Sequence, residues 1–258
     1  MNPNPVEEET RIILRTIAES LRDKRKIKMI RPLILSPSIS SRSNPGSVMA
    51  QALPQPLPIR WIRKPVDSAR SGVKNLPEGE TLCWVEHDVI RNVTPAMLKW
   101  WFGHIDGDVT IQGNRINRYR AWHPDDHILH EYSNRKEDGT VGVGTTMHIV
   151  EMLGRRREHL IDVETEITRL DEGGFAHESR RLGLPVVKME YHFEQVPEGT
   201  LYRNTMTVGL GFTLGKPVNR LIKSFAFDEA YAHAWIKHNI EEVGNFELFL
   251  PQLYASEV

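Results

Sequence analysis

The hydrophobic residues near the end of the chain recur every three or four positions, which is the spacing of one face of an α-helix. Residues 216–249 contain no Pro after Pro217 and no Gly before Gly244, so no helix breaker interrupts this stretch. The pattern predicts one long helix that closes the chain, with apolar positions at Leu221, Phe225, Tyr231, Trp235 and Ile240.

The middle of the chain has the pattern of strands. Residues 108–210 hold short segments rich in Val, Ile, Thr and Tyr, separated by turn sequences such as EDGT, DEGG and VPEGT. This predicts an antiparallel meander. Before it, residues 81–90 (TLCWVEHDVI) have a strand pattern, and Thr94 followed by Pro95 is typical of the start of a helix.

The first 80 residues follow neither pattern for long. Residues 6–29 carry isoleucines and a leucine close to helical spacing, which predicts a helix. Residues 36–80 are dense in Ser, Pro and Gly and predict an irregular arm, suited to contacts with a second copy in a homodimer. We therefore divide the chain into an N-terminal helix and extended arm, residues 1–80, and a second domain, residues 81–258.

The predicted order of elements is strand, short helix, antiparallel strands and long C-terminal helix. This order resembles the helix-grip architecture of the birch pollen allergen and the steroid-transfer (START) domain, an α+β fold. In that fold a curved antiparallel sheet wraps around the last helix. The space between sheet and helix is a natural place for an apolar ligand.

Composition narrows the function classes. The chain of 258 residues is 40% hydrophobic and 26% charged with a net charge of −1, which favours neither disorder nor a nucleic-acid surface. Cys83 is the only cysteine, so internal disulfides and thiolate-rich zinc cages are excluded and a reducing compartment is expected. With no apolar run of membrane-spanning length and three glutamates at 7–9, we expect no membrane partner and a cytoplasmic location.

Candidate chemistry lies on the predicted C-terminal helix. His238 and Glu242 are four residues apart and continue the stripe of Tyr231 and Trp235, which predicts that the pair faces inward. The alternative is an exposed pair that contributes a few tenths of a kcal/mol. Glu241, one position earlier, is assigned to the solvated face.

A second cluster lies in residues 117–132 (NRYRAWHPDDHILHEY), which hold three of the eleven histidines. Pro124 suggests a bend followed by a strand with His127 and Leu129 on one face. His130 could lie on the solvated face instead, and either aspartate could cap the turn. Farther along, Glu151 lies in an apolar strand pattern, where a carboxylate needs a partner, whereas Glu158 follows three arginines and fits a solvated turn.

Four segments together carry a family resemblance: VTPAMLKWWFGHI, YRAWHPDDHILHEY, VGVGTTMHIVEMLG and HNIEE. Over residues 81–247 the chain resembles the diacetylphloroglucinol hydrolase family, which includes phloretin hydrolase. The resemblance implies one Zn²⁺ held by two His and two Glu, and hydrolysis of the carbon–carbon bond between an acyl group and a phenolic ring. Matched motif by motif, it implies the ligands His127, Glu151, His238 and Glu242, with Glu158 as the competing register for Glu151.

The same resemblance suggests residues that contact a small aromatic ketone. Tyr119 matches the tyrosine that hydrogen-bonds a ring hydroxyl, and Tyr202 and His192 are further contacts. His130 stands where the family can have an amide side chain, which leaves the identity of the acylphenol open. Tyr119, His192 or His130 would carry the proton to the ring carbon. Two alternatives stay open: a non-catalytic carrier of a hydrophobic ligand, and a metal-assisted step without hydrolysis on a polyketide or terpenoid.

Overall fold

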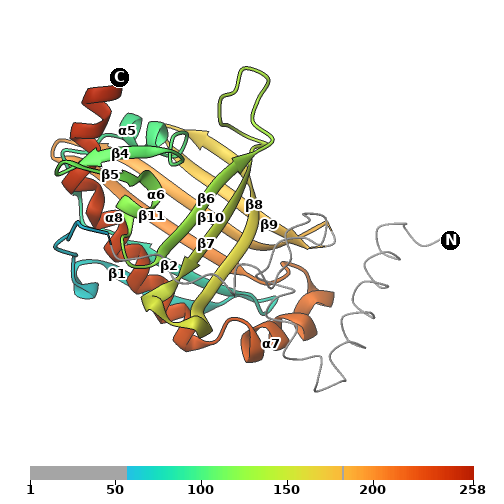
Figure 1. The fold of residues 1–258 in the computed structure, drawn as a ribbon. Helices are drawn as coiled ribbons and strands as arrows, with labels where there is room; N and C mark the ends of the chain where they lie inside the picture. The colour runs from blue at the N-terminus through green and yellow to red at the C-terminus, as the bar shows by residue number, and fades with distance from the viewer. Residues whose placement is uncertain (1–56, 182) are drawn as a thin grey trace.

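The computed structural model describes residues 57–181 and 183–258, and its largest element is a curved antiparallel sheet (Figure 1). From β6 to β11 each strand pairs with the next, which confirms the predicted meander. Strands β2 and β1 extend the sheet beyond β11, and the two-residue strand β3 (Ile90–Arg91) also pairs with β11. The path order is β1 (Arg70–Asn75), β2 (Thr81–Glu86), β11 (Gly199–Val208), β10 (Leu184–Val196), β9 (Gly174–Arg181), β8 (Leu160–Asp171), β7 (Thr146–Met152) and β6 (His127–Ser133).

Shorter elements connect the strands. Helix α5 (Pro95–Trp101) begins as predicted, because Thr94 Oγ1 accepts a hydrogen bond from the backbone N–H of Met97 at 3.3 Å. The hairpin of β4 (Asp108–Ile111) and β5 (Asn114–Asn117) forms a separate sheet and leads into helix α6 (Arg118–Trp122). Single 3₁₀ turns are η1 (Val66–Ser68), η2 (Leu153–Arg155), η3 (Arg157–His159) and η4 (Thr213–Gly215).

The prediction of one continuous C-terminal helix is wrong, because the segment forms two helices. Helix α7 (Lys216–Phe225) ends, and α8 (Glu229–Glu257) begins after Asp228. The Asp228 carboxylate accepts from the backbone N–H of Tyr231 at 2.9 Å and so caps the new helix. None of the helices in the described residues is long and apolar enough to span a membrane.

The predicted irregular arm is wrong for residues 70–75, which form β1 paired in register with β2. The sheet therefore begins before residue 81. Residues 57–64 lie against α8, where the Trp61 ring stacks on Phe249 with a centroid distance of 6.2 Å. The Trp61 indole also donates to the Ala121 carbonyl at 2.7 Å. The predicted helix at residues 6–29 lies outside the described residues, and the homodimer expected from the arm stays a prediction.

Helix α8 packs between the inner face of the sheet and the segment 57–64, and this is the helix-grip arrangement. An aromatic cluster fastens one end of it: the Trp101 ring on α5 makes edge contacts with Trp122, Phe246 and Phe249 at centroid distances of 5.1–5.9 Å. Residues of α8 nearer its other end line a cavity between helix and sheet. The fold thus places the polar residues of α8 at a cavity instead of in a filled core.

Candidate metal centre

A cavity of about 110 Å³ lies between α8 and the inner face of strands β6 to β11. One water molecule needs roughly 10–15 Å³ of such space, so the cavity has the size of a small organic molecule. Its walls are mainly aliphatic and aromatic. The stripe predicted on the C-terminal helix is confirmed, because Tyr231, Trp235, His238 and Glu242 all line this cavity.

The four predicted ligands lie close together, and three of them, Glu151, His238 and Glu242, line the cavity. The Nε2 atoms of His127 and His238 are 3.3 Å apart, and Glu242 Oε2 lies 3.4 and 3.6 Å from them, respectively. Glu151 directs one oxygen at each ring, at 3.6 Å from His127 Nε2 and 3.7 Å from His238 Nε2. Ligands bound about 2.0–2.1 Å from a tetrahedral Zn²⁺ are about 3.3–3.4 Å from one another. The mutual spacing of His127, His238 and Glu242 is close to these values, and Glu151 lies beside that group.

The hydrogen bonds of the two imidazoles occupy their Nδ1 atoms, so the Nε2 atoms could bind a metal ion. His127 Nδ1 donates to the backbone carbonyl of Tyr119 at 2.7 Å, and His238 Nδ1 donates to Asp126 Oδ2 at 2.9 Å. With both rings neutral the two Nε2 lone pairs face each other, which is unfavourable unless a proton or a metal cation lies between them. The tightest group, His127, His238 and Glu242, is fully buried and could hold a metal ion.

In the absence of metal, the close approach of these acidic and imidazole side chains shifts the pKa values of Glu242 and His238. Burial, together with the negative charges of Glu151 and Asp126, raises the pKa of Glu242 to about 8. Burial alone would lower the pKa of His238, but Glu242, Asp126 and Glu151 outweigh it and raise that pKa to about 9. The site thus attracts positive charge strongly enough to keep a proton on a buried imidazole.

Tyr119 contacts two of the predicted ligands, His127 and Glu151. Its ring stacks on His127 with a centroid distance of 3.8 Å and an angle of 6° between the planes, and its hydroxyl donates to the Glu151 carboxylate. Burial, reinforced by the charge of Glu151, raises the pKa of the Tyr119 phenol well above its usual value. The phenol therefore keeps its proton and donates it in a hydrogen bond to Glu151 at the cavity wall.

A β-bulge places His130 in the same cavity. Strand β6 pairs His127 with Glu151 and Leu129 with Val150, so one extra residue, Ile128, interrupts the alternation. The prediction that Leu129 shares a face with His127 is therefore wrong, because the bulge turns Leu129 away and His130 inward. His130 is 5% exposed and lines the cavity beside Tyr119.

Behind the ligands lies a buried polar network that the sequence reasoning missed. Asp126 Oδ2 accepts both from His238 Nδ1 and from the backbone N–H of Gly154 at 3.0 Å. Burial would raise the pKa of Asp126, but the hydrogen bond and charge of His238 outweigh it and hold that pKa well below its usual range. His123, Asp126 and His238 also form a group that could hold a cation, although the direct hydrogen bond assigns Asp126 to orienting His238.

Glu241 belongs to this network, so its assignment to the solvated face is wrong. Its side chain is only 10% exposed and accepts from His123 Nε2 at 3.3 Å and from Lys237 Nζ at 2.5 Å. The reason is that residues 57–64 cover the outer side of α8, where Arg63 lies 3.7 Å from the Glu241 carboxylate. A pattern read along the helix alone could not reveal that cover.

The other three predicted residues, His192, Tyr202 and Glu158, do not line the cavity. His192 on β10 is exposed, whereas its neighbours Tyr191 and Phe193 are buried. Side chains alternate between the two faces of a strand, so His192 points away from the cavity and the predicted pocket contact is wrong. Tyr202 is fully buried beside Tyr191 and His87 but is not part of the cavity lining. Glu158 lies on the surface, paired with Arg156 at 2.7 Å.

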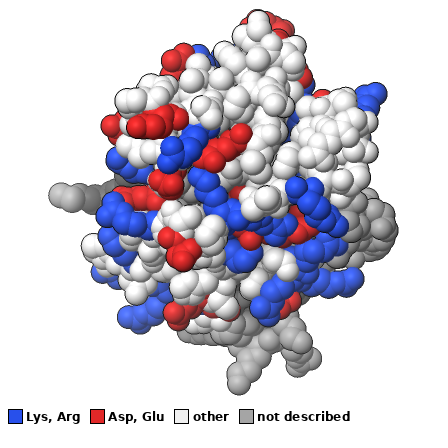
Figure 2. All heavy atoms as spheres, turned by 90° about the vertical axis from the view of Figure 1, so that its left-hand side faces the viewer, with Lys and Arg blue, Asp and Glu red and all other residues white. Residues whose placement is uncertain are grey.

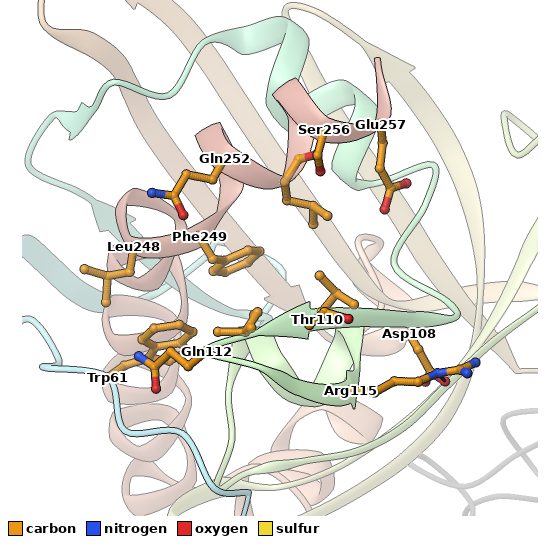
Figure 3. A pocket seen from close by; sticks show the side chains of 13 residues that line it. Trp61, Asp108, Thr110, Gln112, Arg115, Leu248, Phe249, Gln252, Ser256 and Glu257 are labelled. Carbon is orange, nitrogen blue, oxygen red and sulfur yellow. Dashed lines mark hydrogen bonds and ion pairs between the residues drawn. The ribbon is translucent and has the colours of Figure 1, made fainter.

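A larger surface hollow lies elsewhere, and its lining contains no histidine. It is a groove of about 780 Å³ between the β4–β5 hairpin and the end of α8 (Figure 3). Its labelled acidic residues are Asp108, which pairs with Arg115 at 2.9 Å, and Glu257, which pairs with Arg118. On the face of the molecule shown in Figure 2, basic and acidic side chains are interspersed. The internal cavity is therefore the candidate site.

The protein is thus a helix-grip domain with an internal cavity, and buried His and Glu side chains at that cavity could hold a metal ion. The chain belongs to the DAPG hydrolase PhiG domain family, whose sequence profile matches residues 59–255. Among curated proteins the comparison finds no match.

Several solved structures are similar to this chain at low sequence identity. The KanY protein shares 9% identity over 68% of this chain and 99% of its own, with a TM-score of 0.44. A START superfamily protein from Mycobacterium smegmatis shares 12% over 63% and 97%, with a TM-score of 0.37. Ara h 8.0201 shares 16% over 63% and 98%, with a TM-score of 0.34.

Proposed function

We propose that the protein is a zinc-dependent hydrolase that cleaves the carbon–carbon bond between an acyl group and a phenolic ring. The observation that carries this proposal is the convergence of the buried donors His127, His238 and Glu242, with Glu151 beside them, at a mainly apolar internal cavity. Membership of the DAPG hydrolase PhiG domain family supports the same reaction class.

In this proposal His127, His238, Glu151 and Glu242 hold the ion. When bound, zinc supplies a Lewis acid that polarises a ketone carbonyl and makes water more acidic. The side chains around it exclude bulk water, since His127, His238 and Glu242 are at most 5% exposed. Asp126 and the Tyr119 carbonyl hold the two imidazoles in the orientation that presents Nε2.

The reaction needs a proton at the ring carbon. Hydrolysis adds the hydroxyl of water to the carbonyl carbon, breaks the bond to the ring and leaves the electron pair on the ring carbon, which must take up a proton. Ring hydroxyls ortho or para to that carbon stabilise this charge. In this proposal Tyr119, whose hydroxyl shares its proton with Glu151, delivers that proton, and His130, whose ring contacts the Tyr119 ring on the same wall, is the alternative donor.

The test is incubation of the zinc-loaded protein with acylated phenols, with the carboxylic acid and the deacylated phenol quantified together. We expect the two products in equal amounts. His130→Leu should lower the rate, whereas His192→Leu, on the outer face of the sheet, is the matched control and should not. Tight binding of acylphenols without either product would contradict hydrolysis and favour a carrier.

A further inference from the structure

A ladder of polar side chains crosses the mainly apolar contact between α8 and the sheet. His87 Nε2 lies 3.0 Å from Asn204 Oδ1 on β11, and the Asn204 amide donates to the Asn239 side chain on α8. Asn239 Nδ2 in turn lies 3.1 Å from the backbone carbonyl of Trp235. His87, Asn204 and Asn239 are at most 8% exposed. The proposed reaction gives this buried ladder no role.

The ladder can be hydrogen-bonded in one direction only. A backbone carbonyl only accepts, so Asn239 Nδ2 donates to Trp235, and Asn239 Oδ1 is left to accept from Asn204 Nδ2. The Asn204 oxygen then accepts from His87 Nε2–H. A shift of α8 along or about its axis breaks the bond between the two asparagines. Each buried amide group that then lacks a partner costs about 1–3 kcal/mol.

The apolar residues beside the ladder define the position of α8 less sharply. Ile236, Ile240 and Val243 of α8 belong to the same core as Cys83 and Val85 of β2, a strand that α8 contacts. Apolar contacts are non-directional, so they favour burial of this helix face without fixing its rotation. In coiled coils a single buried asparagine fixes the register of the helices. The ladder has the chemistry for the same role here.

A metal centre needs this precision because its predicted ligands come from separate elements. His238 and Glu242 lie on α8, whereas His127 and Glu151 lie on β6 and β7. Successive residues of a helix are rotated by about 100°, so Asn239 flanks the stripe of His238 and Glu242. Metal–ligand distances vary by only about 0.2 Å. A small rotation or translation of α8 therefore weakens the site.

A second set of hydrogen bonds holds α8 to α6. Trp122 Nε1 donates to the Glu242 carbonyl at 2.8 Å, and Asn245 Nδ2 donates to the Trp122 carbonyl at 2.8 Å. The ladder instead connects α8 to β11 and to His87, which directly follows β2. The helix is thus fastened to two different parts of the fold by directional bonds.

We propose that His87, Asn204 and Asn239 are positioning residues that fix the rotation and axial position of α8, and thereby place His238 and Glu242 for metal binding. The inference rests on the metal centre of the proposed function. It assigns to these three residues a role in metal affinity, although none of them contacts the metal.

The test removes both amides in the variant Asn204→Leu/Asn239→Leu. Within the ladder only His87 Nε2–H then lacks its partner, so the variant should fold. Competition for zinc against a chromophoric chelator should show an affinity about tenfold below wild type, the lower end of the range for residues that orient metal ligands. An affinity within about twofold of wild type would overturn the positioning role.

Asn219→Leu is the matched control for the loss of a buried asparagine. Asn219 is 1% exposed and bonds to the N–H and the carbonyl of Leu210 and to the Glu78 carbonyl, so it anchors α7 and not α8. This variant should lower the melting temperature at least as much as the double variant, yet keep zinc affinity within about twofold of wild type. An equal loss of affinity in both would reduce the ladder to general stability and overturn the proposal.

Spin labels give a readout that does not depend on zinc. Nitroxides at His233→Cys on α8 and Lys188→Cys on β10, both exposed positions, report where the helix lies over the sheet, and Cys83 is buried. In chelator, electron–electron distance measurements should give one narrow distribution with the ladder intact and a shifted or broader one in the double variant. An unchanged distribution would overturn the proposal. Wild-type protein that binds no zinc would refute the proposed function, while these distances would still decide whether the ladder positions α8.

Discussion

Replacing Asp126 by Asn tests whether the buried carboxylate behind His238 positions a metal ligand. Asp126 Oδ2 accepts from His238 Nδ1 at 2.9 Å and from the Gly154 N–H at 3.0 Å. The backbone bond from Met152 N to the Asp126 carbonyl, at 2.8 Å, does not involve the side chain and persists in the variant. The substitution therefore removes a charge and leaves the local backbone in place.

The expected loss can be worked from these contacts. A hydrogen bond to a charged group contributes about 1.5–3 kcal/mol and one between neutral groups about 0.5–1.5, so the change costs about 1–1.5 kcal/mol. Loss of a residue that orients a metal-bound histidine typically lowers metal affinity about 10–100-fold, or about 1.4–2.7 kcal/mol. The two ranges overlap near a tenfold loss, and we predict a decrease of at least that size in zinc affinity.

The assay is competition for zinc against a chromophoric chelator at fixed pH. Asp125→Asn is the matched control, because Asp125 is the adjacent aspartate but pairs with Arg63 on the outer side of the turn. Its zinc affinity should stay within about twofold of wild type, since it contacts none of the four ligands. Wild-type affinity in Asp126→Asn, or an equal loss in both variants, would refute the positioning role.

Three further predictions concern the ligands, the pH dependence and the core. His238→Ala and Glu242→Ala should each abolish bound zinc and acylphenol hydrolysis together, and full zinc content in either purified variant would contradict the ligand set. In the metal-free folded protein the pKa values of His238, about 9, and Glu242, about 8, lie above the ordinary values of these groups. The folded state therefore binds more protons than the unfolded state. The free energy of unfolding should consequently fall as the pH rises from about 6.5 to 9. Thermal unfolding in chelator checks this, and a melting temperature that rises over that range would contradict it; zinc should stabilise most at the alkaline end, where its ligands lose protons readily. Trp101→Ala should lower the free energy of unfolding by about 3–5 kcal/mol because the ring is fully buried, whereas the half-buried Trp100→Ala should cost less in the same urea titration.

The parts of the fold that could be predicted from sequence depend on local interactions. The cap of α5 by Thr94 and the inward stripe of α8 both follow from residues within one or two helical turns. The break at Asp228 has an equally local cause, an N-cap carboxylate, but apolar residues on both sides of it gave the appearance of one helix.

The errors in the site came from contacts distant in sequence. The bulge at Ile128 turns His130 inward, and alternation along a strand cannot reveal it because it depends on pairing with β7. Glu241 is buried because residues 57–64 cover it, and His123 and Asp126 act behind His238 through a turn whose path only the folded chain defines. Sequence reasoning could therefore nominate ligands by type and spacing, but not the residues that orient them.

The central claim is that His127, Glu151, His238 and Glu242 together hold one zinc ion. X-ray absorption at the zinc edge, on protein purified with zinc and with its metal content measured in the same sample, tests it most directly. We predict one zinc per chain, with only nitrogen and oxygen ligands at about 2.0–2.1 Å. Absence of stoichiometric zinc, or a sulfur ligand at about 2.3 Å, which the buried Cys83 would have to provide, would contradict it.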